Sequence, residues 1–487
     1  MAVFSKTSKL HDIKFGTDGW RALIAKEFTY KNLEIFLNGL AAYILSNYPA
    51  GKKLIIGHDA RFLADRFAAF AAEKINSWGI DVLTINHPVP TPVIAFAAQM
   101  QEFNSCGAIT FTASHNPPEY MGIKYIPEYA GPASLEITNK ILAFIEEAAE
   151  DADKLKVKFT INNSANTQII NPRENYLTHI RSIVNLTAIK EANQKQITKL
   201  VYDPLFACGR TYTDSLLREA GFDLTVLHDH YDPTFGGSLP DPSEKRLTEL
   251  KEMVIKSKAQ LGAANDGDAD RFAFLDEEGN FYPANKSLPI ILKYLIEHKG
   301  YKGTVARTLA TTHLLDEIAI KAGLKHIETA VGFKWLCEIM RREPTVLCAE
   351  ESGGMSILGH IPEKDGILAI LLLSEVMAIT GKKLSTLWQE VQDYVGKKYF
   401  YDKLDLHLDG DLKDKFMATF LSPDLKQIGE FKVSKTDFTE GAKIYFDNGS
   451  WLLARPSGTE AMCRVYLEGN DKEALNKLVA AVQALIK

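Results

Sequence analysis

Short apolar runs typical of buried β-strands alternate with longer amphipathic runs typical of helices over most of the chain. Residues 52–59, "KKLIIGHD", predict a buried strand, and residues 61–79 predict an amphipathic helix that ends at a glycine. The runs at 81–85, 91–100 and 106–112 continue the series as strand, helix and strand. Because parallel neighbouring strands need a crossover between them, this order predicts a parallel sheet with helices on both faces.

The same alternation recurs from 199 to 276 and again from 287 to 354, and from about residue 394 it gives way to strand-like runs and one helix. A chain of 487 residues is too long for a single core, so several domains are expected. We expect the α/β class, with three similar β-α-β domains, each with a mixed sheet built on such parallel strands, and a C-terminal α+β domain. The expected boundaries are 1–165, 166–281, 282–393 and 394–487, with the polar stretch 161–175 as the candidate hinge.

Composition excludes several classes of protein. The net charge is −6 and no block of lysine and arginine stands out, so nucleic acid is not an expected partner. The longest apolar runs are too short to span a bilayer, and the first residues lack the apolar core of a signal peptide. The five cysteines never form a C-x-x-C pair, which argues against disulfides or a zinc site. We expect a cytoplasmic protein without a membrane partner.

The loop "TASHNPPEYMGIKY" places Ser114 at the carboxyl end of a predicted strand. In open α/β sheets, this edge is where ligands bind. The surroundings are not G-x-S-x-G, and no acid and distant histidine can be assigned to a Ser-His-Asp triad. From this loop alone, a nucleophilic serine and a simple turn rich in serine, asparagine and proline are both open.

The loop "NDGDADR" contains three alternating carboxylates, Asp266, Asp268 and Asp270. In an extended segment, residues two apart point the same way, so these groups can converge on one point. Three neighbouring anions repel one another unless a cation lies among them, and oxygen ligands suit Mg²⁺. An EF-hand is disfavoured because Arg271 occupies the position that needs a glycine. A solvated acidic turn is the alternative.

Two further loops carry groups that can bind phosphate or sugar. "RPSGTE", which begins at Arg455, offers guanidinium, hydroxyl and backbone donors to a phosphate. "AEESGG" offers Glu350 and Glu351 as acceptors and Ser352 as donor or acceptor for sugar hydroxyls. Taken singly, each loop is equally typical of an ordinary turn. The sequence has no P-loop motif, and no G-x-G-x-x-G follows a strand, which disfavours P-loop NTPases and Rossmann dehydrogenases.

In chain order, these loops closely resemble those of the α-D-phosphohexomutase family, which includes phosphoglucomutase and phosphomannomutase. The resemblance begins at "KFGTDGWRA" and ends at "RPSGTE", so it covers nearly the whole chain. It implies four domains around a deep central cleft, with three similar α/β domains and a smaller α+β domain. It also implies a hexose phosphate as substrate.

The resemblance implies catalytic roles for several residues. Ser114 matches the family's phosphoserine, which carries a phosphoryl group in the resting enzyme. The implied ligands of Mg²⁺ are Asp266, Asp268, Asp270 and an oxygen on Ser114. Lys124 matches a lysine proposed for proton transfer at the attacking hydroxyl, and a charged lysine that contacts phosphate is the alternative.

Other residues match supporting positions. Arg21 and Arg271 resemble cations that orient the phosphoserine, and His115 resembles a support for its loop. "VGFKW", which contains Gly332 and Lys334, resembles the loop that senses the hydroxyl distinguishing epimers. The residues that resemble substrate contacts are Arg271, Gly332, Lys334, Glu350, Ser352, Lys364, Arg455, Ser457, Gly458 and Thr459. Among these, Arg455, Ser457, Gly458 and Thr459 match the family loop that holds the non-reacting phosphate of the substrate.

The resemblance implies a cycle in which phosphorylated Ser114 converts a hexose phosphate into a 1,6-bisphosphate, which turns over and returns its other phosphate. Within the family, E-E-S in the sugar loop is typical of phosphoglucomutases, so the resemblance implies a phosphoglucomutase that acts on glucose phosphates and uses Mg²⁺ and glucose 1,6-bisphosphate. Gly354 stands where a family histidine is frequent, and Ala269 stands where glycine is frequent, which is tolerable unless its φ is positive. The alternatives are a bifunctional phosphomannomutase/phosphoglucomutase and a glucose 1,6-bisphosphate synthase. We expect a monomer or weak homodimer.

Overall fold

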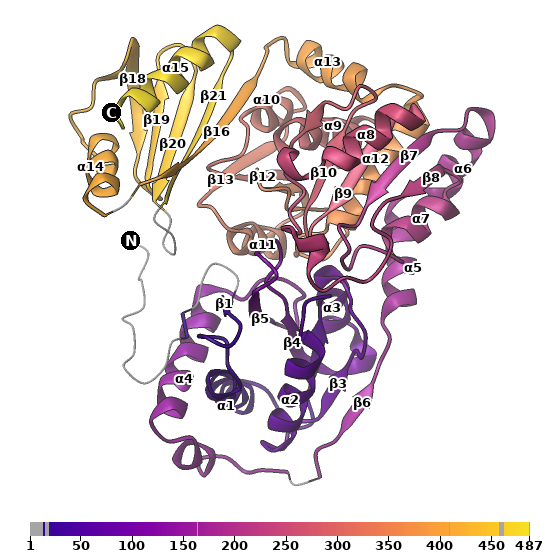
Figure 1. The fold of residues 1–487 in the computed structure, drawn as a ribbon, viewed down its shortest axis with the longest axis vertical. Coiled ribbons are helices and arrows are strands. Elements are labelled where there is room, and N and C mark those ends of the chain that lie inside the picture. The colour runs from indigo at the N-terminus through magenta and orange to yellow at the C-terminus, as the bar shows by residue number, and fades with distance from the viewer. Residues whose placement is uncertain (1–12, 15–18, 163, 409, 457–461, 487) are drawn as a thin grey trace.

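The computed structural model describes residues 13–14, 19–162, 164–408, 410–456 and 462–486, and these form four sheets, one in each domain (Figure 1). In the view of Figure 1, the first domain lies at the bottom and the C-terminal domain, in yellow, at the upper left. The second and third domains lie side by side above the first. Three α/β domains are followed by one of a different architecture, as expected.

The first domain has a six-stranded sheet in the order β1-β5-β4-β2-β3-β6. Its strands are β1 (Trp20–Leu23), β2 (Lys53–His58), β3 (Val82–Thr84), β4 (Ser105–Phe111), β5 (Tyr120–Ile126) and β6 (Thr167–Ile169). Its helices are α1 (Tyr30–Asn47), α2 (Ala64–Asn76), α3 (Thr91–Ala98), η1 (Gln101–Phe103) and α4 (Leu135–Lys156). β2 pairs in parallel with β3 and β4, whereas β5 is antiparallel to β4 and β1 to β5, so the sheet is mixed. β6 lies just past the expected boundary at 165 and extends this sheet beside β3.

The second domain has a five-stranded sheet in the order β11-β10-β9-β7-β8. Its strands are β7 (Lys199–Asp203), β8 (Asp223–Val226), β9 (Leu261–Asn265), β10 (Phe272–Leu275) and β11 (Phe281–Tyr282). Its helices are α5 (Arg173–Ile183), α6 (Leu186–Lys195), α7 (Thr213–Glu219), η2 (Phe235–Gly237), η3 (Glu244–Arg246) and α8 (Thr248–Ser257). The acidic loop joins the antiparallel strands β9 and β10, both fully buried.

The third domain has a four-stranded sheet in the order β13-β12-β14-β15. Its strands are β12 (Thr304–Thr308), β13 (Lys325–Thr329), β14 (Thr345–Ala349) and β15 (Met355–Ile357). Its helices are α9 (Ala284–Glu297), α10 (Leu314–Lys321), α11 (Phe333–Arg342), α12 (Gly366–Thr380) and α13 (Leu384–Val395). The first three strands of the order are parallel and β15 is antiparallel, so this sheet is mixed as well.

The C-terminal domain has a six-stranded sheet in the order β16-β21-β20-β19-β18-β17, and neighbouring strands of this order are antiparallel. Its strands are β16 (Phe400–His407), β17 (Gln427–Ile428), β18 (Phe431–Asp437), β19 (Ala442–Phe446), β20 (Trp451–Pro456) and β21 (Met462–Gly469). Its helices are α14 (Gly410–Phe420) and α15 (Lys472–Ala484). This arrangement confirms the expected α+β class of the tail.

One apolar core contains residues of the first three domains, the first domain has a second core of its own, and the C-terminal domain has a separate core. Helix α12 lies at the centre of the shared core, and its residues 366–378 are all buried. Asp365 caps this helix by accepting from the Leu368 N–H, and it also accepts a hydrogen bond from Tyr176 on α5. Among the described residues, no helix has both the length and the apolar character needed to cross a membrane.

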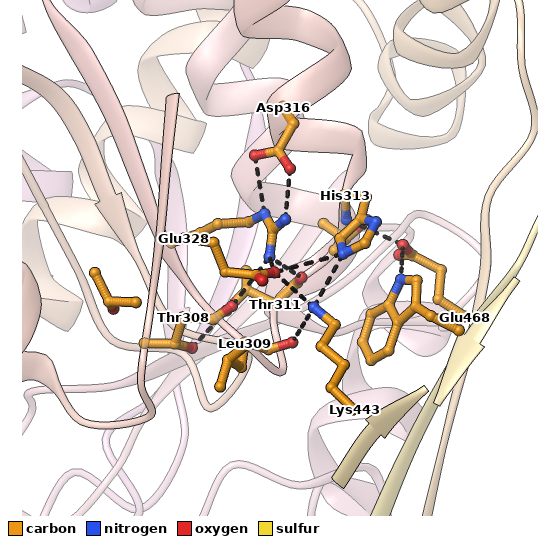
Figure 2. A network of polar contacts seen from close by, with 12 residues as sticks. Thr308, Leu309, Thr311, His313, Asp316, Glu328, Lys443 and Glu468 are labelled. Carbon is orange, nitrogen blue, oxygen red and sulfur yellow. Dashed lines mark hydrogen bonds and ion pairs between the residues drawn. The ribbon is translucent and has the colours of Figure 1, made fainter. Parts of the chain in front are cut away.

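A buried polar network joins the C-terminal domain to the third domain (Figure 2). Lys443 on β19 is 0% exposed, and its ammonium donates to the carbonyl of Leu309 at 2.8 Å and to Glu328 Oε2 at 2.6 Å. Glu328 also pairs with Arg307, whose guanidinium is held by Asp316. Beside the network, Leu309 and Ala310 pack on Trp451, Leu453 and Tyr466. Apolar contacts from β20 and β21 and the paired charges at Lys443 of β19 therefore dock the C-terminal sheet on the third domain.

Candidate active site

Ser114 follows the end of β4 and faces the acidic loop of the second domain. Its side-chain hydroxyl donates to Asp266 Oδ2 at 2.8 Å, and the residue is only 1% exposed. Its φ is +51°, a conformation that non-glycine residues rarely adopt, and its N–H donates to Thr112 Oγ1 at 2.8 Å. Strained backbone of this kind is concentrated at functional sites. The fold therefore aims the Ser114 hydroxyl at the predicted metal loop.

Arg61, which the sequence analysis did not identify, holds the serine loop in shape. Its guanidinium donates to the backbone carbonyls of Ser114, Asn116, Pro117 and Tyr120, at 2.5 to 3.2 Å. Its Nε lies 3.2 Å from Asp59 Oδ2, and both side chains are fully buried. The buried Asp59 carboxylate therefore fixes the position of the planar Arg61 guanidinium. No motif in the sequence indicates this role, because the contacts are to backbone atoms more than fifty residues away.

Asp266, Asp268 and Asp270 are all buried, and each offers a carboxylate oxygen within 4.8 Å of the others. Burial, followed by the neighbouring Asp270 and Asp268 carboxylates, raises the pKa of Asp266 well above its ordinary value. Asp268 Oδ1 and Asp270 Oδ1 are buried without a hydrogen-bond partner among the described residues. Mutual repulsion and unpaired acceptor oxygens are both relieved by a hard cation, so these residues fit Mg²⁺.

The three carboxylates converge by a different route from the one expected. Residues 266–270 form a turn between β9 and β10 rather than an extended segment, so strand alternation does not bring them together. Ala269 has a φ of +56°, the conformation in which a methyl group is strained. A Cβ on Gly267 would lie 2.5 Å from the Ser114 carbonyl oxygen. Close approach of two backbones therefore requires glycine at 267 and makes the serine–carboxylate contact possible.

Two buried lysines approach the same carboxylates from different domains. Lys124 on β5 donates to Asp268 Oδ2 at 3.0 Å and to Asp270 Oδ2 at 3.4 Å. Burial alone would lower the pKa of Lys124, but Asp268 and Asp270 raise it above its ordinary value. Lys364 of the third domain lies 3.4 Å from Asp270 Oδ2. Both predicted lysines thus belong to the same charged cluster as the metal loop.

The remaining catalytic candidates surround Ser114. His115 Nδ1 lies 3.4 Å from the Ser114 hydroxyl, and burial, followed by Arg271 and Arg21, lowers the pKa of His115 well below its ordinary value. Arg21 donates to Asn116 Oδ1 at 3.0 Å. The Arg271 N–H donates to Asp266 Oδ1 at 3.0 Å, and its Nε lies 3.8 Å from Asp270 Oδ1. The structure thus brings the candidate cations to the serine and metal loops.

Thr91 is a second residue that the sequence analysis missed. At the start of α3, its hydroxyl donates to Asp268 Oδ2 at 2.7 Å and its N–H donates to the Asp268 carbonyl at 3.0 Å. A threonine at a helix start ordinarily reads as a capping residue, so nothing in the sequence indicates this contact. Thr91 therefore anchors the metal loop to the first domain.

The sugar-loop residues lie in the third domain. Glu350, 7% exposed, accepts the Gly332 N–H on Oε1 at 3.1 Å, so the "EES" and "VGFKW" loops are in contact. Lys334 lies on α11 with its ammonium over the Trp335 ring, and Ser352 is partly buried. At Gly354, a Cβ would lie 2.6 Å from Lys364 Cδ. The space of the frequent family histidine is therefore occupied here by the Lys364 side chain.

Arg455 lies near the end of β20 and forms an ion pair with Glu440. Burial alone would lower the pKa of Arg455, but Glu440 raises it. The other carboxylate oxygen of Glu440 accepts the Val331 N–H at 2.7 Å. Ser457, Gly458 and Thr459 lie outside the described residues.

Comparison with known proteins identifies the family. Four models of the phosphoglucomutase/phosphomannomutase family match the chain. They are alpha/beta/alpha domain I at residues 12–152, domain II at 174–279, domain III at 283–394 and the C-terminal domain at 417–485. The matches follow the chain in the order of the four sheets.

Curated relatives and solved structures agree with this match. A phosphoglucomutase/phosphomannomutase of Thermococcus kodakarensis is 31% identical over 94% of this chain and 95% of its own length. A probable phosphoglucosamine mutase of Methanosarcina barkeri is 32% identical over 94% and 95% of the two chains. The crystal structure of a putative phosphomannomutase from Thermus thermophilus superposes with a TM-score of 0.83 at 28% identity, covering 97% of this chain and 99% of its own.

The four domain models and the relative that is matched over nearly its whole length define the class of this protein, a phosphoryl-transferring mutase. The chain belongs to the phosphoglucomutase/phosphomannomutase family, the α-D-phosphohexomutases, whose members are isomerase-class enzymes.

Proposed function

We propose that this protein is a phosphoglucomutase, which interconverts glucose 1-phosphate and glucose 6-phosphate through phosphorylated Ser114 and glucose 1,6-bisphosphate. The observation that carries this proposal is the 2.8 Å contact between the buried Ser114 hydroxyl and Asp266 of the acidic triad. It supports a phosphoryl carrier at the one place among the described residues where three acidic side chains can hold a metal ion together.

Ser114 is the group that gives and takes the phosphoryl. In the first half of the cycle, the bond between phosphorus and Ser114 Oγ breaks while a new P–O bond forms at the free hydroxyl of the sugar phosphate; the sugar hydroxyl loses its proton and Ser114 Oγ gains one. In the second half, the bond between the sugar oxygen and the other phosphate breaks, that phosphate bonds to Ser114 Oγ, and the proton passes from the serine hydroxyl to the sugar oxygen. Mg²⁺ held by Asp266, Asp268 and Asp270 would neutralise the transferring phosphoryl group and improve serine as a leaving group.

The chain's own cations orient the phosphoryl group. Lys124 lies at Asp268 and Asp270, which supports its placement beside the attacking hydroxyl; its raised pKa favours a charged phosphate contact over a proton acceptor. Arg21 contacts the serine loop and Arg271 the metal loop, and both would hold phosphate oxygens through charge-assisted hydrogen bonds. His115 supports the loop. With substrate bound, the low exposure of Ser114 would limit the access of water, which competes with the sugar hydroxyl.

The far end of the substrate would rest on the third and C-terminal domains. Arg455 with Ser457, Gly458 and Thr459 would hold the non-reacting phosphate, and Lys364 would contact phosphate from the third domain. Glu350 and Ser352 would bind sugar hydroxyls, next to the loop that contains Gly332 and Lys334. Because the two ends of the bisphosphate must exchange, the same groups would hold either phosphate in turn.

Glucose is the sugar that the E-E-S loop supports. The second candidate is a bifunctional phosphomannomutase/phosphoglucomutase, which is favoured by the name of the Thermococcus relative, a phosphoglucomutase/phosphomannomutase. A glucose 1,6-bisphosphate synthase would use the same phosphoserine and stop after half of the cycle.

The experiment that tests the proposal is an assay with Mg²⁺ on glucose 1-phosphate, mannose 1-phosphate and glucosamine 1-phosphate, started with a trace of glucose 1,6-bisphosphate. We expect turnover of glucose 1-phosphate to exceed that of the other sugars. Ser114→Ala should lose at least about a thousandfold in kcat, whereas Ser77→Ala, an exposed serine in the same domain, should not.

The other outcomes are equally informative. Comparable rates with glucose and mannose would establish the bifunctional enzyme, and preference for glucosamine 1-phosphate would reject glucose as the substrate. Absence of turnover with all three sugars would reject a mutase, and formation of glucose 1,6-bisphosphate from fructose 1,6-bisphosphate would then identify the synthase.

A further inference from the structure

Two adjacent backbone N–H groups in the third domain bind two glutamates from different domains. The Val331 N–H donates to Glu440 Oε2 of the C-terminal domain at 2.7 Å. The next N–H, that of Gly332, donates to Glu350 Oε1 of the sugar loop at 3.1 Å. The Val331–Gly332 turn therefore joins the sugar loop to the C-terminal domain.

Glu440 also binds the arginine of the predicted phosphate loop. Its Oε1 pairs with Arg455, while its Oε2 takes the Val331 N–H, so a single carboxylate contacts both segments. Its place is set by the β18–β19 hairpin: Gly441 has a φ of +72°, and a Cβ there would lie 2.2 Å from the Ala454 carbonyl oxygen. Close approach of this turn to β20 holds Glu440 beside Arg455.

The strand that follows Glu440 is fixed to the third domain. Lys443, three residues further along, is buried in the network of Figure 2 and donates to the Leu309 carbonyl and to Glu328. Because this anchor is independent of Arg455, the hairpin can stay docked while the Glu440 side chain changes partner. Glu440 is partly exposed, as is Arg455, so a ligand can reach the pair.

We propose that Glu440 is a positioning residue that couples occupancy of Arg455 to the Val331–Gly332 turn, and through that turn to Glu350. This inference rests on the proposed function, in which Arg455 binds the non-reacting phosphate. Glu440 occupies one Nη of the guanidinium and so presents the remaining donors to a phosphate. The same carboxylate accepts the Val331 N–H and so fixes the position of the Val331–Gly332 turn. The phosphate site at Arg455 and the sugar loop at Glu350 are thereby held in a fixed relation to each other.

Glu440→Gln tests this coupling because it keeps the shape and an acceptor oxygen but removes the charge. We expect KM for glucose 1-phosphate to rise about tenfold while kcat changes less than about threefold, as for a lost charge-assisted hydrogen bond. We also expect the ratio of kcat/KM for glucose over mannose 1-phosphate to fall severalfold. Asp437→Asn is the matched control, since Asp437 binds only Thr439 in the same hairpin among the contacts described, and its kinetics should stay within about twofold.

A double-mutant cycle separates coupling from a general weakening of the domain. In the Arg455→Met background, Glu440→Gln should have no further effect on KM, because the partner that it orients is gone. Additive effects of the two changes would overturn the proposal. So would an equal loss of kcat/KM for both sugars, or the same kinetic change in Asp437→Asn.

Glu440→Asp is a second variant that keeps the charge on a side chain one methylene shorter. Retained KM with a changed sugar ratio is expected, since a shortened side chain cannot reach both Arg455 and Val331. Unchanged values of both KM and sugar ratio in Glu440→Asp and Glu440→Gln would overturn the coupling.

A binding measurement distinguishes this inference from the proposed function. Calorimetric titration of Ser114→Ala with glucose 6-phosphate reports binding without turnover, and adding Glu440→Gln should weaken binding about tenfold. If wild-type protein turns over none of the sugar phosphates, the proposed function fails whatever Glu440 does. If turnover is normal but Glu440→Gln binds glucose 6-phosphate as tightly as its parent, only the coupling fails.

Discussion

The hydroxyl of Ser114 lies 2.8 Å from Asp266 Oδ2, although the two residues are 152 positions apart and belong to different domains. Three features of the fold make this contact possible: the positive φ of Ser114, the absence of a side chain at Gly267 and the hold of Arg61 on the serine loop. Each of them can be changed separately.

The acidic triad should make the protein's stability depend on Mg²⁺. An ion that binds only the folded protein stabilises it by about 2.7 kcal/mol at a hundredfold excess over its dissociation constant. Thermal unfolding with Mg²⁺ and with chelator should show this difference in wild-type protein, and Asp266→Asn should abolish it. Asp223→Asn, an exposed carboxylate of the same domain, should retain the Mg²⁺ effect. An Mg²⁺ effect that survives Asp266→Asn would place the ion elsewhere.

The metal loop should tolerate glycine at position 269 but not alanine at position 267. Gly267→Ala puts a Cβ 2.5 Å from the Ser114 carbonyl oxygen, so we expect a loss of stability of about 1–3 kcal/mol and at least about tenfold lower kcat. Ala269→Gly relieves a strained φ in the folded protein but increases the conformational entropy of the unfolded chain. These two effects on stability are about 1 kcal/mol each and oppose one another. Urea denaturation and steady-state kinetics check both. Near-wild-type activity in Gly267→Ala would show that the two loops need not approach closely.

Arg61 should be irreplaceable by lysine. An ammonium cannot reach the four backbone carbonyls that the guanidinium binds, so buried acceptors lose their partners. We expect Arg61→Lys to lower the free energy of unfolding by about 2 kcal/mol or more and to reduce kcat. Arg66→Lys, an exposed arginine on α2, is the control and should change neither. Normal kcat in a folded Arg61→Lys protein would contradict a role in shaping the serine loop.

The contribution of Lys443, at the junction of the third and C-terminal domains, to the free energy of unfolding should increase above pH 8. Burial, followed by Arg307, lowers the pKa of Lys443 to about 8, whereas a lysine in the unfolded chain titrates near 10.4. Unfolding therefore takes up a proton between these values, and the contribution of Lys443 to the free energy of unfolding rises with pH from about 8 to about 10 and is flat below. The pKa difference limits the gain to about 3 kcal/mol.

Tryptophan fluorescence during urea unfolding measures this effect, since Trp451 lies at the junction and donates to Glu468. The stability of wild-type protein relative to Lys443→Met should increase between pH 8 and 10. Lys432→Met, an exposed lysine on β18, should show no such trend. A difference between wild type and Lys443→Met that is independent of pH would mean that Lys443 keeps its proton throughout.

Much of the fold follows from local patterns. Strands buried on both faces appear as continuous apolar runs, so β2 and β4 were predicted within a residue or two, and the period of α2 identified an amphipathic helix. Near residue 394 the alternation of strands and helices gives way to strand-like runs. Strands with one buried face alternate apolar and polar residues, and this change predicted the α+β domain. The loops that carry Ser114 and the three aspartates also stand out, because their residue types are unusual after a buried strand.

The tertiary structure alone decided how those loops meet. The aspartates converge through a turn with a positive φ at Ala269, which alternation in an extended strand did not predict. Arg61 and Thr91 bind backbone or side-chain atoms of distant loops, and Glu440 joins two domains. The periodicity of the local sequence gives no signal for such contacts. Periodicity reports which face of one element is buried. Contacts between loops depend on how the domains pack against one another, and only the folded chain fixes that packing.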